Sequence, residues 1–258
     1  MDDLSDFSFV MGSPGPPLDQ ALALIAAAGR PQTDPTAQVR RLDDLATTTA
    51  AEDAAAVCRS LFGPGGFRGN TEHYYDPANS LIDLVLDRRV GIPITLAVIA
   101  MEVARRCDVE LMGVGMPGHF LLRDSHDPRA FFDAFDGGAA LDPSDVRELF
   151  LRLHGDALEF REEFLAPTPP TMIVARVLDN LRAAYARTHD REGLVRALAM
   201  QVELPGPNLG IRRQLAGALA SDGRLIDAAD EHDRLGALDP VHGQDHAAAA
   251  LHLRAQLN

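Results

Sequence analysis

Apolar residues recur with helical spacing through most of the first 106 residues. The pattern predicts four helices, at 18–28, 39–45, 51–62 and 94–106. Gly29 ends the first of these helices, and Gly63-Pro64-Gly65-Gly66 ends the third. Pro93 opens the fourth helix, because the first turn of a helix does not need the N–H that proline lacks. A fifth helix, starting at Asn79 or Ser80 as a side-chain cap, is predicted to reach Arg88 or Arg89.

The pattern changes after residue 110 to short apolar runs separated by turn residues. Three strands are predicted, at 111–116, 120–123 and 130–135, with Pro117-Gly118 and the segment 124–129 as turns. Asp142 then caps a helix that runs to residue 153. Helices followed by a few neighbouring strands indicate an α+β fold with a small antiparallel sheet.

The chain divides by composition into a leader, a main domain and a tail. Residues 1–17 end in Gly-Ser-Pro-Gly-Pro-Pro and are interpreted as a flexible or strand-forming leader, and residues 18–166 form the main domain. A proline-rich joint separates it from residues 171–258, which are helical throughout. Leucines such as 181 and 215 or 204 and 238 lie 34 positions apart, the period of tetratricopeptide helix pairs. Two such pairs and a closing helix are too few for an independent solenoid, so we expect the tail to pack on the main domain. The tail either completes the core as a plain helical cap or forms a peptide-binding groove.

The charge balance excludes some partners. The 24 basic and 38 acidic residues give a net charge of −14, and no segregated basic patch is visible, which argues against nucleic-acid binding. The N-terminal sequence MDDLSDFSFV resembles no signal peptide, and the longest apolar run is too short to span a membrane. The two cysteines, Cys58 and Cys107, imply no disulfide framework. We therefore expect a cytoplasmic protein without membrane attachment.

One ordered set of motifs points to a known architecture. A helix opens on Gly91-Ile92-Pro93, a strand approaches Met116-Pro117-Gly118-His119, and the next carries Phe131-Phe132-Asp133. This order resembles the transglutaminase-like, papain-related superfamily, where the helix start presents a Cys and the strands present a His and an Asp. The resemblance makes His119 and Asp133 the imidazole and its orienting carboxylate. Pro93 stands where the Cys nucleophile is expected.

A narrower resemblance covers residues 18–258. The segments HYYDPANS, LDRRVGIPITLA and PGHFLLR are similar to the SirB-type family, bacterial proteins with a transglutaminase-like core followed by tetratricopeptide-like repeats. That family generally has GIPI at this helix start, so Pro93 is interpreted as a family trait. Cys107 follows Pro93 by about four helical turns, or ~21 Å along the axis, and cannot replace the missing thiol.

Each candidate site residue also has a structural interpretation. His119 and Asp133 form a degenerate triad, or are a strand-start histidine and a turn-capping carboxylate. Tyr74, Asn79 and Arg89 are candidate ligand-binding residues; packing, helix capping and carbonyl capping are their structural alternatives. The histidines 73, 119 and 126 with Asp133 match no familiar zinc spacing, so no metal and no cofactor are expected.

These observations lead to three hypotheses about function. The first is a non-catalytic binding or regulatory protein that recognises a peptide, a protein or a small polar ligand beside His119 and Asp133. The second is a hydrolase that uses these two residues as a general acid/base pair without a covalent intermediate. The third is an interaction scaffold that binds a partner through the helical tail. A thiol transglutaminase or protease mechanism is not expected, and the sequence does not specify an oligomeric state.

Overall fold

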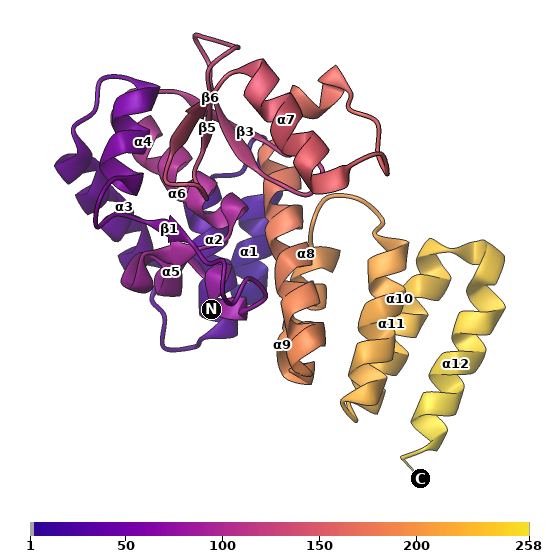
Figure 1. The fold of residues 1–258 in the computed structure, drawn as a ribbon. Helices are drawn as coiled ribbons and strands as arrows, with labels where there is room; N and C mark the ends of the chain where they lie inside the picture. Colours follow the sequence, from indigo (N-terminus) through magenta and orange to yellow (C-terminus); the bar gives the residue numbers. More distant parts are fainter. Residues whose placement is uncertain (1–2, 258) are drawn as a thin grey trace. The chain divides into compact units, whose positions relative to one another are not determined.

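The computed structural model describes residues 3–257, which divide into two compact units. Residues 15–177 form one unit, and residues 3–14 with 178–257 form the other. The described chain is mostly helical and contains a small antiparallel sheet (Figure 1). No helix within residues 3–257 combines the length and apolar character needed to cross a membrane.

The unit of residues 15–177 contains helices and all the strands of the described chain. Its helices are α2 (Leu18–Gly29), α3 (Pro35–Thr49), α4 (Ala54–Phe62), α5 (Ile82–Arg88), α6 (Pro93–Arg106) and α7 (Pro143–His154). Its strands are β1 (Arg68–Gly69), β2 (Val90–Gly91), β3 (Leu111–Val114), β4 (Leu121–Asp124), β5 (Phe131–Asp133) and β6 (Ala139–Leu141). The 3-10 turns η1 (Pro77–Asn79) and η2 (Glu162–Leu165) complete it.

The four strands β3-β4-β5-β6 pair antiparallel in chain order, and both faces of the sheet are covered. Leu121 and Phe131 belong to a buried cluster with Val146 and Phe150 of α7. Successive side chains of a strand point to opposite faces. Neighbouring residues such as Phe132 therefore face the other side, where α6 packs against β3 and β4. Helix α6 is buried along nearly its whole length.

The proline-rich segment after η2 joins the edge of this sheet. Strand β3 is an edge strand, so one side of its backbone lacks a neighbouring strand. The Thr168 N–H donates to the carbonyl of Gly113 at 2.8 Å, and the Thr168 hydroxyl accepts from the N–H of Gly115 at 2.7 Å. Thr168 therefore covers the end of β3, and the segment is part of the fold.

The other unit is built from helices. They are α1 (Asp3–Met11), α9 (Arg191–Val202), α10 (Leu209–Ser221), α11 (Leu225–Leu238) and α12 (Gly243–Ala255), with the 3-10 turn η3 (Pro240–His242). Consecutive helices from α9 to α12 contact one another. Helix α8 (Pro170–Thr188) passes from one unit into the other. The compact division therefore falls inside a helix, between Val177 and Leu178, and not at the proline-rich joint.

The N-terminal segment departs from the expected flexible leader. Residues 3–11 form α1, which packs against α9 in the same unit, and residues 1 and 2 lie outside the described part. Phe7 and Met11 lie four positions apart, on one side of a helix, and both are buried. This pair supplies the apolar face that the acidic composition of the segment obscures.

The helix starts also differ from the predictions, and α4 begins at Ala54 behind an Asp53 cap, three residues later than predicted. Helix α3 begins at Pro35 behind an Asp34 cap, earlier than the apolar pattern indicated. Neither Asn79 nor Ser80 caps α5, whose N-cap residue is Leu81 without a side-chain hydrogen bond. The Asn79 side chain instead bonds to the preceding loop, as described below.

Candidate functional site

The start of α6 is held beside the end of the sheet by β1 and β2. These strands pair in parallel, with Gly69 opposite Gly91. A Cβ at Gly69 would lie 2.6 Å from the ring of Phe135, so this position admits no side chain. Phe135 therefore lies directly against the strand pair that leads into Pro93, which is buried at the first helical position of α6.

His119 and Asp133 are hydrogen-bonded to each other. His119 Nε2 lies 2.9 Å from Asp133 Oδ2, and both side chains are about nine-tenths buried. The other carboxylate oxygen of Asp133 accepts from the N–H groups of Phe135 at 2.9 Å and Asp136 at 3.3 Å. A carboxylate can only accept, so the neutral imidazole carries its proton on Nε2. Asp133 is thus fixed by the backbone and in turn fixes the orientation and tautomer of His119.

The turn that leads into His119 is fixed by two side chains from neighbouring helices. Nη2 of Arg176, on α8, donates to the carbonyls of Met116 at 3.0 Å and His119 at 2.7 Å. Nε2 of His154, on α7, lies 3.0 Å from the carbonyl of Pro117. Gly118 has a φ of +75°, and a Cβ there would meet His154 at 3.0 Å. The backbone on both sides of His119 is therefore positioned before any ligand binds.

A row of aromatic rings extends from His119 to the surface. The His119 and Phe135 ring centroids are 6.1 Å apart, and Phe135 and Tyr74 follow at 6.0 Å, both edge to face. Tyr74 is 37% exposed and contacts Tyr75, which is 50% exposed. Partial burial raises the pKa of the Tyr74 phenol, and the positive charge of Arg176 opposes that rise. These residues (His119, Asp133, Phe135, Tyr74 and Arg176) are called the His119 site below.

Nδ1 is the second ring nitrogen of His119. Among the described residues it has no hydrogen-bond partner, and it is not sealed from solvent. Because Nε2 holds the proton, Nδ1 presents a lone pair. The His119 site can therefore accept a hydrogen bond from an N–H or O–H group, or take a proton from such a group.

The other predicted ligand-binding residues have local bonding partners. Asn79 is fully buried; its amide nitrogen donates to the carbonyls of His73 and Tyr74, at 2.8 and 3.1 Å. It accepts from Asn70 and Arg88. Asn79 therefore shapes the loop that carries Tyr74. Arg89 ends α5 with a φ of +53°, donates to the carbonyl of Gly65 at 3.1 Å and lies over the ring of Phe67.

Sequence reasoning missed Arg176, His154 and Phe135. Arg176 and His154 belong to helices 57 and 35 residues after His119, and no local spacing links them to the motif. Phe135 did carry a signal, because it follows Asp133 by two residues and aromatic residues commonly flank ligand sites.

Neither cysteine belongs to the His119 site. Cys58 is buried in α4, and burial raises the pKa of its thiol to about 12. Cys107 ends α6 at the opposite end from Pro93, and its sulfur lies 3.6 Å from the carbonyl of Ala46. Within residues 3–257, no three His, Cys, Asp or Glu side chains gather as a metal site.

A family model described as "Transglutaminase-like superfamily" matches residues 22–179. The chain belongs to the transglutaminase-like superfamily. The match includes Pro93, His119, Asp133 and Arg176, so the whole His119 site lies inside the domain of that superfamily.

Several relatives of this transglutaminase-like protein are bacterial. A UPF0162 protein of Xylella fastidiosa strain Temecula1 is 46% identical over 138 residues, which cover 52% of this chain and 49% of the relative. A UPF0162 protein of Pseudomonas aeruginosa is 34% identical over 201 residues, covering 74% and 73%. F-box only protein 21 of Mus musculus is 46% identical over 68 residues, covering 26% and 11%. The matched segment thus spans about half the length of the Xylella relative. No solved structure matches the chain.

Proposed function

We propose that this protein is a non-catalytic binding protein whose His119 site recognises a hydrogen-bond donor on a peptide or small polar ligand. The proposal rests on two features taken together. Nδ1 of His119 is oriented and has no hydrogen-bond partner among the described residues, and a proline stands at the nucleophile position. Thiol catalysis requires a thiolate next to the imidazole. Pro93 offers neither a nucleophile nor a backbone N–H, so the site retains recognition groups without the reacting group.

The surroundings of Nδ1 suit a peptide-like ligand. An amide N–H can donate to Nδ1, while the Phe135 and Tyr74 rings provide an apolar surface next to it. Because Asp133 and Arg176 already position the imidazole and its backbone, little side-chain ordering is required when the ligand binds. We further propose that the chain belongs to the SirB-type branch, in which GIPI at this helix start is a family trait.

The test is a binding measurement on paired histidine variants. Capped dipeptides are titrated into the full-length protein while the imidazole ¹⁵N signals are followed by NMR. His119→Ala should weaken binding by roughly tenfold or more, the scale of a buried hydrogen bond plus lost contact. His126→Ala is the matched control, because its ring is 85% exposed in a turn. Ligands that bind His119→Ala as tightly as the wild type would disprove the proposal.

Pro93→Cys tests the position of the missing nucleophile independently. A thiol at the first turn of α6 gains from the helix dipole and, in the proposed arrangement, also from the imidazole of His119. Iodoacetamide should therefore modify position 93 faster than it modifies Cys58, and His119→Ala in the same background should slow that modification. Equal rates with and without His119 would show that the imidazole does not face the start of α6.

A hydrolase is the second candidate, because the fixed tautomer also suits a general base. Nδ1 could remove a proton from water as the water attacks a carbonyl, with Asp133 stabilising the resulting imidazolium. The same dipeptides distinguish the two functions. A binding protein leaves the dipeptides intact. A hydrolase cleaves them, and His119→Ala should abolish this cleavage.

The tail provides a third candidate, a tetratricopeptide-like surface for a partner's helix or chain terminus. A cavity of about 740 Å³ lies within the unit that contains the tail, between α8, α9 and α10, with an alanine- and leucine-rich lining and Arg182 and Arg191 among the lining residues. Gly217 also lines it, and a Cβ there meets nothing within 4 Å. Gly217→Gln should therefore fill the cavity without disturbing α10. Unchanged capture of a partner by this variant would dismiss the cavity as the docking surface.

A further inference from the structure

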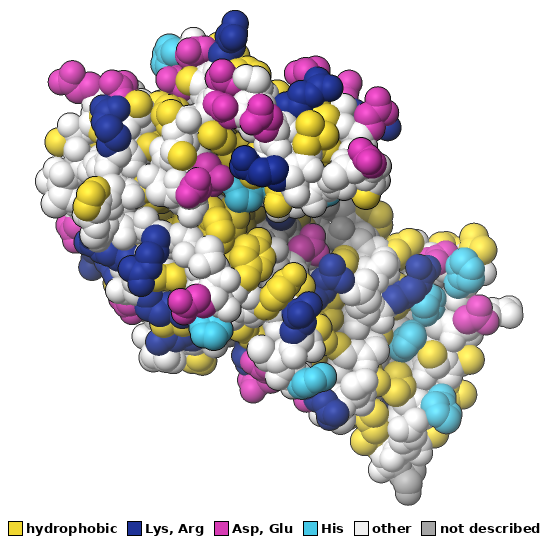
Figure 2. All heavy atoms as spheres, in the orientation of Figure 1, with side chains coloured by type: hydrophobic (Ala, Val, Ile, Leu, Met, Phe, Trp, Pro, Cys, Tyr) yellow, Lys and Arg dark blue, Asp and Glu magenta, His cyan; other side chains and the backbone are white. Residues whose placement is uncertain are grey.

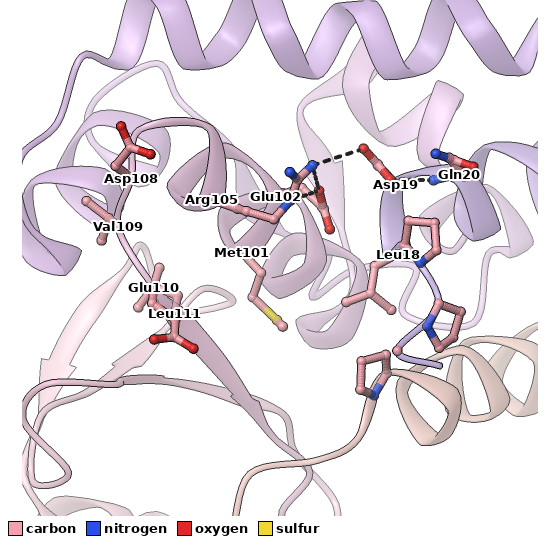
Figure 3. A pocket seen from close by; sticks show the side chains of 14 residues that line it. Leu18, Asp19, Gln20, Met101, Glu102, Arg105, Asp108, Val109, Glu110 and Leu111 are labelled. Carbon is pink, nitrogen blue, oxygen red and sulfur yellow. Dashed lines mark hydrogen bonds and ion pairs between the residues drawn. The ribbon is translucent and has the colours of Figure 1, made fainter. Parts of the chain in front are cut away.

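A cavity of about 690 Å³ opens at the far end of α6, inside the unit of residues 15–177. It lies between the segment that leads into α2, the last turns of α6 and the start of β3 (Figure 3). Glu102 lines it, nine residues after Pro93, or about 14 Å along the helix axis. The cavity is therefore separate from the His119 site and plays no part in the proposed function.

Two buried carboxylates lie at this end of α6. Asp19, in the first turn of α2, is 4% exposed, and Glu102 is 5% exposed. Arg106 connects them: its Nη2 lies 2.6 Å from Asp19 Oδ2, and its Nη1 lies 2.8 Å from Glu102 Oε2. Arg106 also pairs with Asp43 at 2.6 Å, so its charge is shared among three carboxylates.

The remaining cation of the network is at the surface. Arg105 reaches Glu102 Oε2 at 2.8 Å and Asp19 at 3.4 Å, but its side chain is 60% exposed. Figure 3 shows its guanidinium group between the two carboxylates, with an interaction drawn to each. Exposed ion pairs contribute little because water and salt compensate for them. A competing cation can therefore displace Arg105 at small cost.

One oxygen of Glu102 has no hydrogen-bond partner among the residues that the structure describes. All hydrogen bonds from Arg105 and Arg106 to this carboxylate go to Oε2. Among the described residues Oε1 accepts none, although the side chain is almost fully buried and lines the cavity. Burial and the nearby charge of Asp19 raise the pKa of Glu102, as expected for a carboxylate whose negative charge is not fully compensated.

The rest of the lining combines negative charge with apolar surface. Asp108 and Glu110 add two exposed carboxylates, so four acidic residues and one arginine line the cavity. Leu18 and Met101 point into the same hollow (Figure 3), and Val109 and Leu111 also line the cavity. A matching ligand is thus cationic at one end and aliphatic along its length.

We propose that this cavity binds an aliphatic cation, a primary ammonium or guanidinium group on an apolar chain, with Oε1 of Glu102 accepting from the cationic head. The chain of the ligand lies against Leu18 and Met101. Arg105 moves aside toward solvent or remains beside the head on Oε2. The same chemistry occurs in free alkylamines and in the Lys or Arg side chains of a peptide.

Calorimetric titration of the full-length protein at low salt tests the proposal. The probes are n-hexylamine, n-butylguanidine and n-hexanol. Hexanol has the same alkyl chain as hexylamine but carries no charge. Hexylamine should bind with a Kd of roughly 1 mM, as expected for a ligand of few atoms, and hexanol much more weakly. Added salt should weaken hexylamine binding. A short end-capped peptide whose single charge is a central Lys distinguishes the sources: tighter binding than hexylamine indicates a peptide side chain, and weaker binding a free amine.

Two variants locate the binding. Glu102→Gln keeps the shape of the side chain and should reduce the affinity for hexylamine roughly tenfold or more, the loss expected for a charge-assisted hydrogen bond. Arg105→Gln removes the competing cation and should tighten binding severalfold, which provides a test that does not require the Glu102 variant to fold. Equal binding of hexanol and hexylamine, or unchanged affinities in both variants, would overturn the proposal.

Discussion

Replacing Arg176 by alanine is the most direct test of how the His119 turn is held. The guanidinium group donates two hydrogen bonds to main-chain carbonyls, those of Met116 and His119. It also lies 5.6 Å from the centroid of the Phe120 ring. Arg176→Ala removes all three interactions at once and leaves the two carbonyls without this donor.

The expected loss follows from the kind and the surroundings of these bonds. A hydrogen bond to a charged group contributes about 1.5–3 kcal/mol, and the cation–π contact about 0.5–1 kcal/mol where it is partly exposed. Met116 is fully buried, whereas His119 is partly accessible, so water can replace only one of the two bonds. We therefore expect Arg176→Ala to lower the free energy of unfolding by about 2–4 kcal/mol. Arg176→Lys should lose less, since an ammonium can still reach one carbonyl.

The assay is urea denaturation combined with native-state hydrogen exchange. Denaturation gives the total change in stability, and exchange shows whether the loss occurs at the amides of β3 and β4, which flank the turn. Arg152→Ala is the matched control. Arg152 is an exposed residue of α7 and should change stability by less than about 0.5 kcal/mol. An Arg176→Ala effect below about 1 kcal/mol, or a loss of protection spread evenly over the chain, would show that Arg176 does not hold the His119 turn in place.

Three further predictions test other parts of the molecule. Gly217→Ala should stabilise the protein by about 0.5–1 kcal/mol, because a helical glycine with no neighbour within 4 Å gains helix propensity without a clash; a lower melting temperature would contradict this. Burial raises the pKa values of Tyr74 and Tyr185, so their contribution to stability is complete below pH 10 and is lost as pH rises through the folded values. The absorbance of the native protein should therefore show tyrosine ionisation at higher pH than that of the urea-unfolded chain, and coincident curves would disprove the assignment. Burial raises the pKa of the Cys58 thiol to about 12, so iodoacetamide at near-neutral pH should modify the half-buried Cys107 first. Early modification of Cys58, detected by mass spectrometry, would be inconsistent with this packing.

The sequence predicted those elements whose signals are local. Helix α6 was predicted to within one residue at its start, because Pro93 marks a first turn and a long apolar run follows. Strands β3 to β5 were predicted because glycine, proline and aspartate separate them, and their antiparallel pairing is confirmed. Strand β6 was missed, since Ala139-Ala140-Leu141 carries little strand propensity and forms by pairing with β5.

The candidate site shows the same division between local and long-range information. The motif that contains His119 and Asp133 is short, so both residues could be named from the sequence. Arg176 could not be named, because its role depends on α8 approaching the Met116–His119 backbone. Asn79 shows the opposite case: its sequence position suggested a helix cap, but the loop of His73 and Tyr74 offers its amide better partners. Side-chain-to-backbone bonds across a turn compete with capping, and sequence alone does not determine which forms.

Thr168 has a consequence for the order in which the protein is made. Its two bonds cover the end of β3, which lies more than fifty residues earlier in the chain. During synthesis from the N-terminus, β3 and β4 can pair well before residue 168 leaves the ribosome. For that interval the nascent sheet has a bare edge that can pair with another chain. The proline-rich segment can thus cover this end of β3 only late in synthesis, and a nascent chain stalled before residue 168 would display it uncovered.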